Sequence, residues 1–216
     1  QNLNTFLSNH NYDKIIDKKF IETNYNYLNQ NTGWGNGFND DVLFEIVHDT
    51  IKKNNKNNFF ISVLTSNTHG PLGEMQKDCQ YKYNIQSLEE SILCFDKKLT
   101  NFLNILIENY LDNTVIVVIS DHLMLNGMRY YKKYFSENKR YLTNSFISKN
   151  LKMDKFIKNR ETMNHYDLLP TILNLTNVYK GSDAALGISL LNKNYSEEDA
   201  KKRNSFLGKT NYSLKE

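Results

Sequence analysis

The sequence predicts a layered α/β fold with a largely parallel sheet. Amphipathic helix patterns at residues 39–54 and 87–110 alternate with strand-like apolar runs at 59–65 and 115–119. Such alternation is typical of parallel strands joined by crossover helices. The chain has 216 residues, which suits one domain with a real hydrophobic core.

Both helix patterns carry an apolar face and recognisable end signals. In NDDVLFEIVHDTIKKN, Asn39 or Asp40 can cap the helix, acids fill the first turn and lysines lie near the end, as the helix dipole favours. Residues 87–110 open with Ser87 and Glu90, a capping-box pattern. Their apolar stripe predicts a helix packed on the core. It comprises Leu88, Ile92, Phe95, Leu99, Phe102, Leu103 and Leu106.

Three further segments complete the predicted elements. The runs FFISVLT (59–65) and VIVVI (115–119) are typical of buried strands, and YLTNSFIS (141–148) is another strand candidate. The sequence HYDLLPTILNL (165–175) predicts a short helix that Asp167 caps and that tolerates Pro170 in its first turn. Long polar loops follow the first two strands.

Composition excludes some classes of function. The net charge is only +3 and the lysines are spread along the chain, so a nucleic-acid-binding surface is not indicated. The longest apolar runs are strand-sized, so we expect no membrane span and no signal peptide within these residues. The chain opens with Gln1 rather than Met, and we therefore expect further sequence upstream.

Asp121 and His122 stand side by side at the end of the predicted strand 115–119. Carboxylate and neutral imidazole both bind Mn, Zn or Fe, and carboxylate alone serves Mg. Neighbouring strand residues point to opposite faces, so two of them converge on one ion only where the strand ends and the backbone bends. The spacing equally allows Asp121 to cap the next segment and His122 to pack as an ordinary core residue.

Four segments resemble, in order, motifs of the phosphoglycerol transferase I and lipoteichoic acid synthase-like branch of the sulfatase–alkaline phosphatase superfamily. They are TGWGNGFNDDVLFEI, FFISVLTSNTHGP, VIVVISDHL and HYDLLPTILNL. The resemblance implies a three-layer alkaline-phosphatase-like fold with a largely parallel central sheet and its N-terminal part missing. Residues 1–195 would then be the C-terminal part of the catalytic domain, and residues 196–216 a charged tail.

The resemblance also implies roles for individual residues. Asp121 and His122 would be metal ligands, with Mn the expected ion and Mg or Zn possible. His69, which follows the strand 59–65, would contact the transferred phosphate or the glycerol head group. Trp34 would line the head-group pocket, although a packing role is equally open, and Asn126 would bind substrate. In this family the nucleophile, a threonine, lies far upstream of the SDH motif, so we expect no catalytic nucleophile in this chain and no activity from it alone.

The implied reaction moves phosphoglycerol from phosphatidylglycerol to a periplasmic or cell-envelope glycan through a covalent threonine intermediate. The enzyme would sit in the inner membrane through spans outside this chain, with a periplasmic catalytic domain. Phosphoethanolamine transfer or sulfate hydrolysis by the same superfamily remains open, as does a non-catalytic glycan-binding remnant. The resemblance further pairs Cys79 with Cys94 as a disulfide, which persists in the periplasm.

Overall fold

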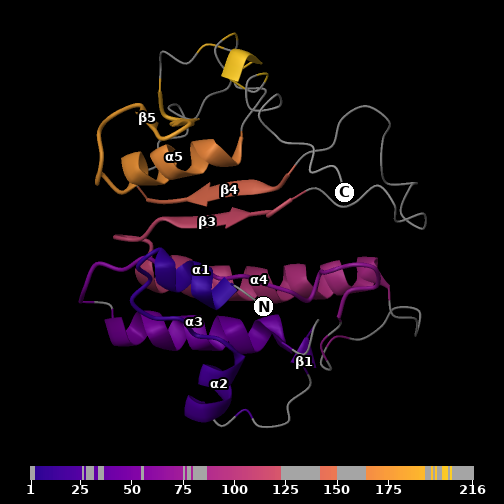
Figure 1. The fold of residues 1–216 in the computed structure, drawn as a ribbon. Helices are drawn as coiled ribbons and strands as arrows, with labels where there is room; N and C mark the ends of the chain where they lie inside the picture. The colour runs from indigo at the N-terminus through magenta and orange to yellow at the C-terminus, as the bar shows by residue number, and fades with distance from the viewer. Residues whose placement is uncertain are drawn as a thin grey trace. The chain divides into compact units, whose positions relative to one another are not determined.

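The structure is a computed structural model of the 216-residue chain (Figure 1). It describes residues 3–25, 27, 32–33, 37–54, 56–74, 76, 79, 87–122, 142–149, 164–192, 196, 198, 201–203 and 205. The chain divides into two compact units, Gln1–Ile107 and Glu108–Glu216. Among the described residues, no helix combines the length and apolar character needed to cross a membrane.

The first unit is built mainly from helices (Figure 1). Two short helices, α1 (Leu3–Asn9) and α2 (Lys18–Asn24), precede a small antiparallel pair of strands, β1 (Thr32–Gly33) and β2 (Gly37–Phe38). The helix α3 (Asp40–Asn54) and most of α4 (Leu88–Tyr110) follow. Both long helices therefore lie where the sequence predicts them, with acids in the first turn of each.

Two sets of contacts hold this unit together. A buried cluster joins α2, β2 and α3, and it consists of Ile21, Phe38, Val42 and Ile46. The ring of Phe44 on α3 stacks on Phe102 of α4 with centroids 4.6 Å apart, so the predicted apolar stripe of α4 does face a neighbouring helix. At the start of α4, one of the two bonds of the expected capping box is found among the described contacts. Glu90 N–H donates to Ser87 Oγ at 3.2 Å.

The predicted buried strand at residues 59–65 differs from the observed structure. These residues belong to no strand of the described part of the chain, and Phe60 and Leu64 are 68% and 65% exposed. A strand needs a second backbone to satisfy its N–H and C=O groups. The apolar pattern specifies a β-prone segment, but the partner must come from elsewhere, and the described residues supply none.

The second unit contains the predicted strand–loop–strand and the short helix. Strand β3 (Ile116–Ile119) pairs antiparallel with β4 (Asn144–Ile147), with Ile116 opposite Ile147. The 3₁₀ turn η4 (His165–Asp167) leads into α5 (Leu168–Leu175), and β5 (Asp183–Ala184) with β6 (Gly187–Ile188) forms a small antiparallel hairpin. All three described sheets are antiparallel pairs, so the expected parallel arrangement is not found among the described strands.

The start of α5 is organised around the buried carboxylate of Asp167. This side chain accepts hydrogen bonds from the N–H groups of Asn164 and Ile188, both at 2.9 Å. Arg203 binds both of its oxygens, at 2.6 and 3.1 Å. Gly187 lets the hairpin approach this turn, because a Cβ there would collide with the carbonyl of Tyr166. Asp167 does not cap α5 as predicted, because its side chain makes no cap hydrogen bond to that helix. Asn164 is instead the N-cap of η4, and Asp167 is its partner in a capping box. The Asp167 carboxylate also joins η4 to β6 and to the region around residue 203.

Candidate functional site

The end of β3 brings the Asp121 carboxylate and the His122 imidazole together. Strand β3 stops at Ile119, and two residues later Asp121 Oδ1 accepts a hydrogen bond from His122 N–H at 2.8 Å. The other carboxylate oxygen, Oδ2, lies 3.5 Å from His122 Nε2. Both side chains are largely exposed, at 69% and 62%. The backbone therefore bends just past the strand, as convergence of two adjacent residues requires.

The donors at this position fit a divalent ion as part of its ligand set. One is a carboxylate oxygen and the other an imidazole nitrogen, the pair that Mn and Zn accept. Their separation of 3.5 Å lets both reach one ion, since metal–ligand bonds to such atoms are about 2.0–2.2 Å. Within the described residues no third His, Cys, Asp or Glu joins them, so they supply part of a site.

The β3–β4 pairing fixes the residue that precedes these donors. Ser120 N–H donates to the carbonyl of Thr143 at 2.9 Å, and Thr143 N–H donates to Ser120 Oγ at 3.2 Å. A third contact to Ser120 comes from the turn η4, where His165 Nε2 lies 2.9 Å from the Ser120 carbonyl oxygen. Sequence reasoning attached no role to this contact, because 45 residues separate the two partners along the chain.

His69 lies in the first unit, on a tightly folded loop that includes a cis Gly70–Pro71 peptide. The loop is held by its own backbone: His69 N–H donates to the carbonyl of Ser66 at 3.0 Å, and Gly73 N–H donates to that of His69 at 3.1 Å. The imidazole is exposed, and its Nδ1 lies 2.8 Å from the carbonyl oxygen of Gly70. A carbonyl only accepts, so Nδ1 carries the proton and the neutral ring has its lone pair on Nε2.

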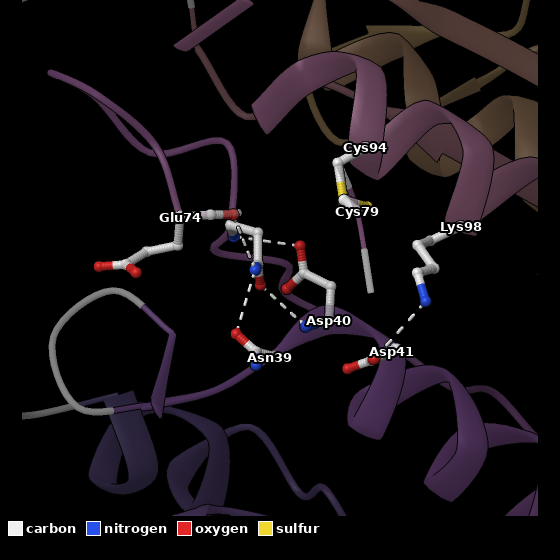
Figure 2. Close-up of a disulfide and its surroundings, with 8 residues drawn as sticks. Asn39, Asp40, Asp41, Glu74, Cys79, Cys94 and Lys98 are labelled. Atoms are coloured by element: carbon white, nitrogen blue, oxygen red, sulfur yellow. Dashed lines mark hydrogen bonds and ion pairs between the residues drawn. A yellow bond between two sulfur atoms is a disulfide. The ribbon is translucent and has the colours of Figure 1, made fainter. Parts of the chain in front are cut away.

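A buried pair of polar side chains anchors the His69 loop to the start of α3. Asp40 is 0% exposed and Asn67 is 1% exposed. The Asp40 carboxylate accepts hydrogen bonds from Ser66 N–H at 2.8 Å and Asn67 N–H at 3.0 Å. In return, Asn67 Oδ1 accepts one from Asp40 N–H at 2.8 Å. We call this network the Asp40–Asn67 lock, and Figure 2 labels Asp40 together with its neighbours Asn39 and Glu74.

The lock extends to both ends of the loop. The Asn67 amide donates to Asn39 Oδ1 at 3.2 Å and to the carbonyl of Glu74 at 3.0 Å. Burial raises the pKa of the Asp40 carboxyl above its ordinary value, while the two backbone N–H groups act in the opposite direction. These bonds hold the loop that carries His69 against the start of α3. The sequence suggested only a helix-capping role for Asn39 or Asp40, and it gave no role to Asn67.

A disulfide between Cys79 and Cys94 ties the chain beyond this loop to α4 (Figure 2). Their Cα atoms are 5.9 Å apart, and the Cys94 side chain is buried. Next to it, Ser91 Oγ donates to the carbonyl of Leu72 at 3.2 Å. The structure thus joins the two cysteines that the family resemblance pairs, and the loop carrying His69 is fastened to α3 at one side and to α4 at the other.

Not every predicted site residue can be located. Trp34 and Asn126 lie outside the described residues. His69 belongs to the first unit, whereas Asp121 and His122 belong to the second. The placement of all three residues just past aliphatic runs predicts that they line one cavity at the carboxyl ends of parallel strands, and this stays a prediction.

A cavity of about 380 Å³ in the first unit involves none of the predicted site residues. Its lining residues are Asn24, Tyr25, Tyr27, Glu45, Ile46, Asp49 and Lys53. The polar groups there already satisfy one another: Tyr27 OH donates to Glu45 at 2.6 Å, and Lys53 donates to Asp49 at 2.6 Å. The hydrogen bond to Glu45 raises the pKa of Tyr27 to about 12. The polar side chains that line this cavity are therefore bound to one another.

Comparison with known proteins gives a match over most of the chain. The family model described as Sulfatase matches residues 1–178. Phosphoglycerol transferase I of Xanthomonas axonopodis pv. citri (strain 306) is 30% identical over 128 residues, or 56% of this chain. The protein of the same name from Citrobacter koseri is 27% identical over 143 residues, or 62% of the chain. Each match spans only 18% of the relative's length. No solved structure matches significantly.

Proposed function

The chain belongs to the sulfatase family, and from that membership we propose that it forms part of a metal-dependent phosphoglycerol transferase. The proposed donor is phosphatidylglycerol, and the proposed acceptor is a glycan of the periplasm or cell envelope. The observation that carries the proposal is the convergence of Asp121 and His122 at the end of β3. Similarity to relatives named phosphoglycerol transferase I supports the choice of transferred group.

In this proposal the described residues hold the reacting groups in place. Asp121 and His122 would hold a divalent ion, with Mn²⁺ expected. Such an ion, when bound, lowers the pKa of an attacking hydroxyl and neutralises charge on phosphoryl oxygens. His69 would face the phosphoglycerol group: a neutral ring would accept a hydrogen bond from a glycerol hydroxyl at Nε2, and a protonated ring would donate one to a phosphoryl oxygen. The attacking threonine would belong to a part of the protein outside these residues.

The proposed fold and location follow from the same family membership. We propose that residues 59–65 and β3 are strands of the largely parallel central sheet of an alkaline-phosphatase-like fold. Trp34 and Asn126 would contribute to the head-group pocket. The Cys79–Cys94 disulfide supports a periplasmic location, because disulfides persist in oxidising compartments. Anchoring in the inner membrane would come from spans outside this chain.

Transfer in membranes that hold the full-length protein tests the function. We expect phosphatidylglycerol labelled in its terminal glycerol to pass label to an added glucan in the presence of Mn²⁺. Asp121→Ala and His122→Ala should each reduce the rate by at least about 100-fold, as loss of a ligand to a catalytic metal implies. Phosphatidylethanolamine labelled in its head group is the matched donor control.

Two results would contradict the proposal. Label transfer from phosphatidylethanolamine but not from phosphatidylglycerol would assign a different head group. Unchanged transfer by Asp121→Ala would show that the residues at the end of β3 take no part in the reaction.

The isolated 216-residue chain should show no Mn²⁺-dependent hydrolysis of a chromogenic phosphodiester.

A further inference from the structure

The carbonyl of Ser120 is the last backbone group before the two proposed metal ligands, and it has a specific partner. His165 Nε2 lies 2.9 Å from this oxygen. A carbonyl oxygen only accepts, so Nε2 must carry the proton and act as the donor. The N–H and the Oγ of Ser120 are bound to Thr143, the residue just before β4. The N–H, the Oγ and the carbonyl of Ser120 therefore each take part in a hydrogen bond. Two of these three bonds are to Thr143, and the third is to His165 in η4.

The backbone that carries His165 is itself firmly fixed. Asn164 Oδ1 accepts a hydrogen bond from Tyr166 N–H at 3.2 Å, and Asp167 Oδ2 accepts one from Asn164 N–H at 2.9 Å. The Asn164 side chain also accepts from the backbone of Asp167, and this contact with the bond from Asn164 N–H to Asp167 closes a capping box around His165. Asp167 is fully buried and bound by Arg203. An imidazole mounted on this turn can define the position of the carbonyl to which it donates.

We propose that His165 is a positioning residue for the Asp121–His122 pair. By holding the Ser120 carbonyl, it fixes the peptide plane from which the bend after β3 starts. That bend sets the 3.5 Å separation between Asp121 Oδ2 and His122 Nε2. The inference rests on the proposed function, because it assigns His165 a role in shaping the metal ligands. His165 acts through Ser120 and is not itself a ligand in this scheme.

Two substitutions separate the hydrogen bond from the bulk of the ring. In His165→Gln the side-chain amide nitrogen lies at about the position of Nε2 and can still donate to Ser120. In His165→Asn the amide nitrogen corresponds to Nδ1 and falls short of that carbonyl. If His165 only supports folding, the loss in each variant should follow the size of its side chain. If His165 positions Ser120, the loss should depend on whether the side chain can still donate to the Ser120 carbonyl. His165→Ala removes the donor altogether, and Tyr166→Ala is the neighbouring control at an exposed position.

The test measures Mn²⁺ binding to the full-length protein, purified in detergent, by electron paramagnetic resonance of the free ion, after circular dichroism has shown that each variant is folded. We expect His165→Ala and His165→Asn to weaken binding by about 10-fold, the effect typical of losing a partner that orients a metal ligand. His165→Gln should restore binding to within about threefold, and Tyr166→Ala should leave it unchanged. Nitrogen-15 spectra of the wild-type imidazole should show the Nε2–H tautomer.

Several outcomes overturn the inference. Unchanged Mn²⁺ binding by His165→Ala, equal losses in the Gln and Asn variants, or an Nδ1–H tautomer would each do so. If the wild type binds no Mn²⁺, or Asp121→Ala binds it as well as the wild type, the proposed metal site fails instead. The positioning role is then decided by the backbone amide resonances of Asp121 and His122. Shifts in His165→Ala that His165→Gln reverses support the role, and their absence refutes it.

Discussion

At the scale of single residues, Asp40 illustrates how a buried charge can organise a loop. Within the described part of the chain, backbone N–H groups rather than a cation satisfy its carboxylate. Burial of a carboxylate is unfavourable unless hydrogen bonds compensate for lost hydration. The two N–H groups come from Ser66 and Asn67, the residues that start the turn carrying His69. These two hydrogen bonds therefore fix the conformation of the loop that carries His69, a residue that the proposed function requires.

Replacing Asp40 should destabilise the first unit. Asp40→Ala leaves the buried N–H groups of Ser66 and Asn67 without acceptors, so we expect the free energy of unfolding to fall by about 2–3 kcal/mol. Asp40→Asn keeps one acceptor oxygen and should lose less. Urea denaturation measures the change. Asp49→Ala removes an exposed ion pair with Lys53 and a 3.3 Å hydrogen bond from Tyr25 OH, and it should change stability by less than about 1 kcal/mol. Equal effects at the two positions would contradict the lock.

The raised pKa of Asp40 predicts a pH dependence of stability. Because the folded state holds this proton more tightly than the unfolded chain, Asp40 contributes most to stability below the unfolded pKa of 3.8. That contribution is lost as pH rises through the higher folded pKa. Unfolding free energies measured between mildly acidic and neutral pH should therefore fall more steeply in the wild type than in Asp40→Asn. Parallel pH profiles for the two proteins would refute the assignment.

At the scale of elements, the Asp167–Arg203 pair joins the turn η4 to residues near the end of the described chain. The Arg203 side chain is 13% exposed and the Asp167 side chain 0%. Removing one partner of a buried pair leaves the other charge uncompensated, so we expect Arg203→Ala to cost about 3 kcal/mol. Lys202→Ala is the matched control, because Lys202 makes an exposed pair with Glu198. Thermal unfolding followed by circular dichroism would distinguish them, and similar losses would argue against the buried pair.

The disulfide is the second device that acts between elements. It links Cys79 to Cys94 on α4 over a sequence separation of 15 residues. Closing a loop of this length stabilises the folded state by about 3 kcal/mol in the chain-entropy model. We expect the Cys79→Ser/Cys94→Ser double variant to lose about this much stability in urea denaturation. In that variant a reducing agent should have no further effect, whereas it should destabilise the wild type. A wild type insensitive to reduction would contradict this.

At the scale of the whole molecule, exposed apolar side chains predict self-association. Residues 59–65 form no ladder with another described segment, and four of their large side chains are exposed: Phe59, Phe60, Val63 and Leu64. An extended, apolar segment with unpaired backbone is a template for a strand of another copy. Analytical ultracentrifugation of the 216-residue chain should show mass increasing with concentration. The Phe60→Lys/Leu64→Lys variant should remain monomeric, and an association unaffected by it would place the contact elsewhere.

The helices and the strand end could be predicted from the sequence because their signals are local. Apolar periodicity and end charges define α3 and α4 within one or two residues, since a helix satisfies its own backbone hydrogen bonds. The abrupt change from aliphatic residues to Asp121 and His122 is also a local signal, and it marks the end of β3. The Cys79–Cys94 pairing also followed from the family that the motifs resemble, whereas the cap at the start of η4 comes from Asn164 and not from the predicted Asp167.

Contacts between distant residues could be decided only by the tertiary structure. Residues 59–65 have the composition of a strand, but pairing depends on a second segment, and local pattern says nothing about which one. The backbone partners of the Asp40 carboxylate lie 26 and 27 residues away. Asp167 has distant partners 21 and 36 residues away, and the partner of His165 is 45 residues away. A carboxylate or imidazole on its own is compatible with capping, surface exposure or a site. Only folding brings the second group within hydrogen-bonding distance, and that contact determines what each side chain does.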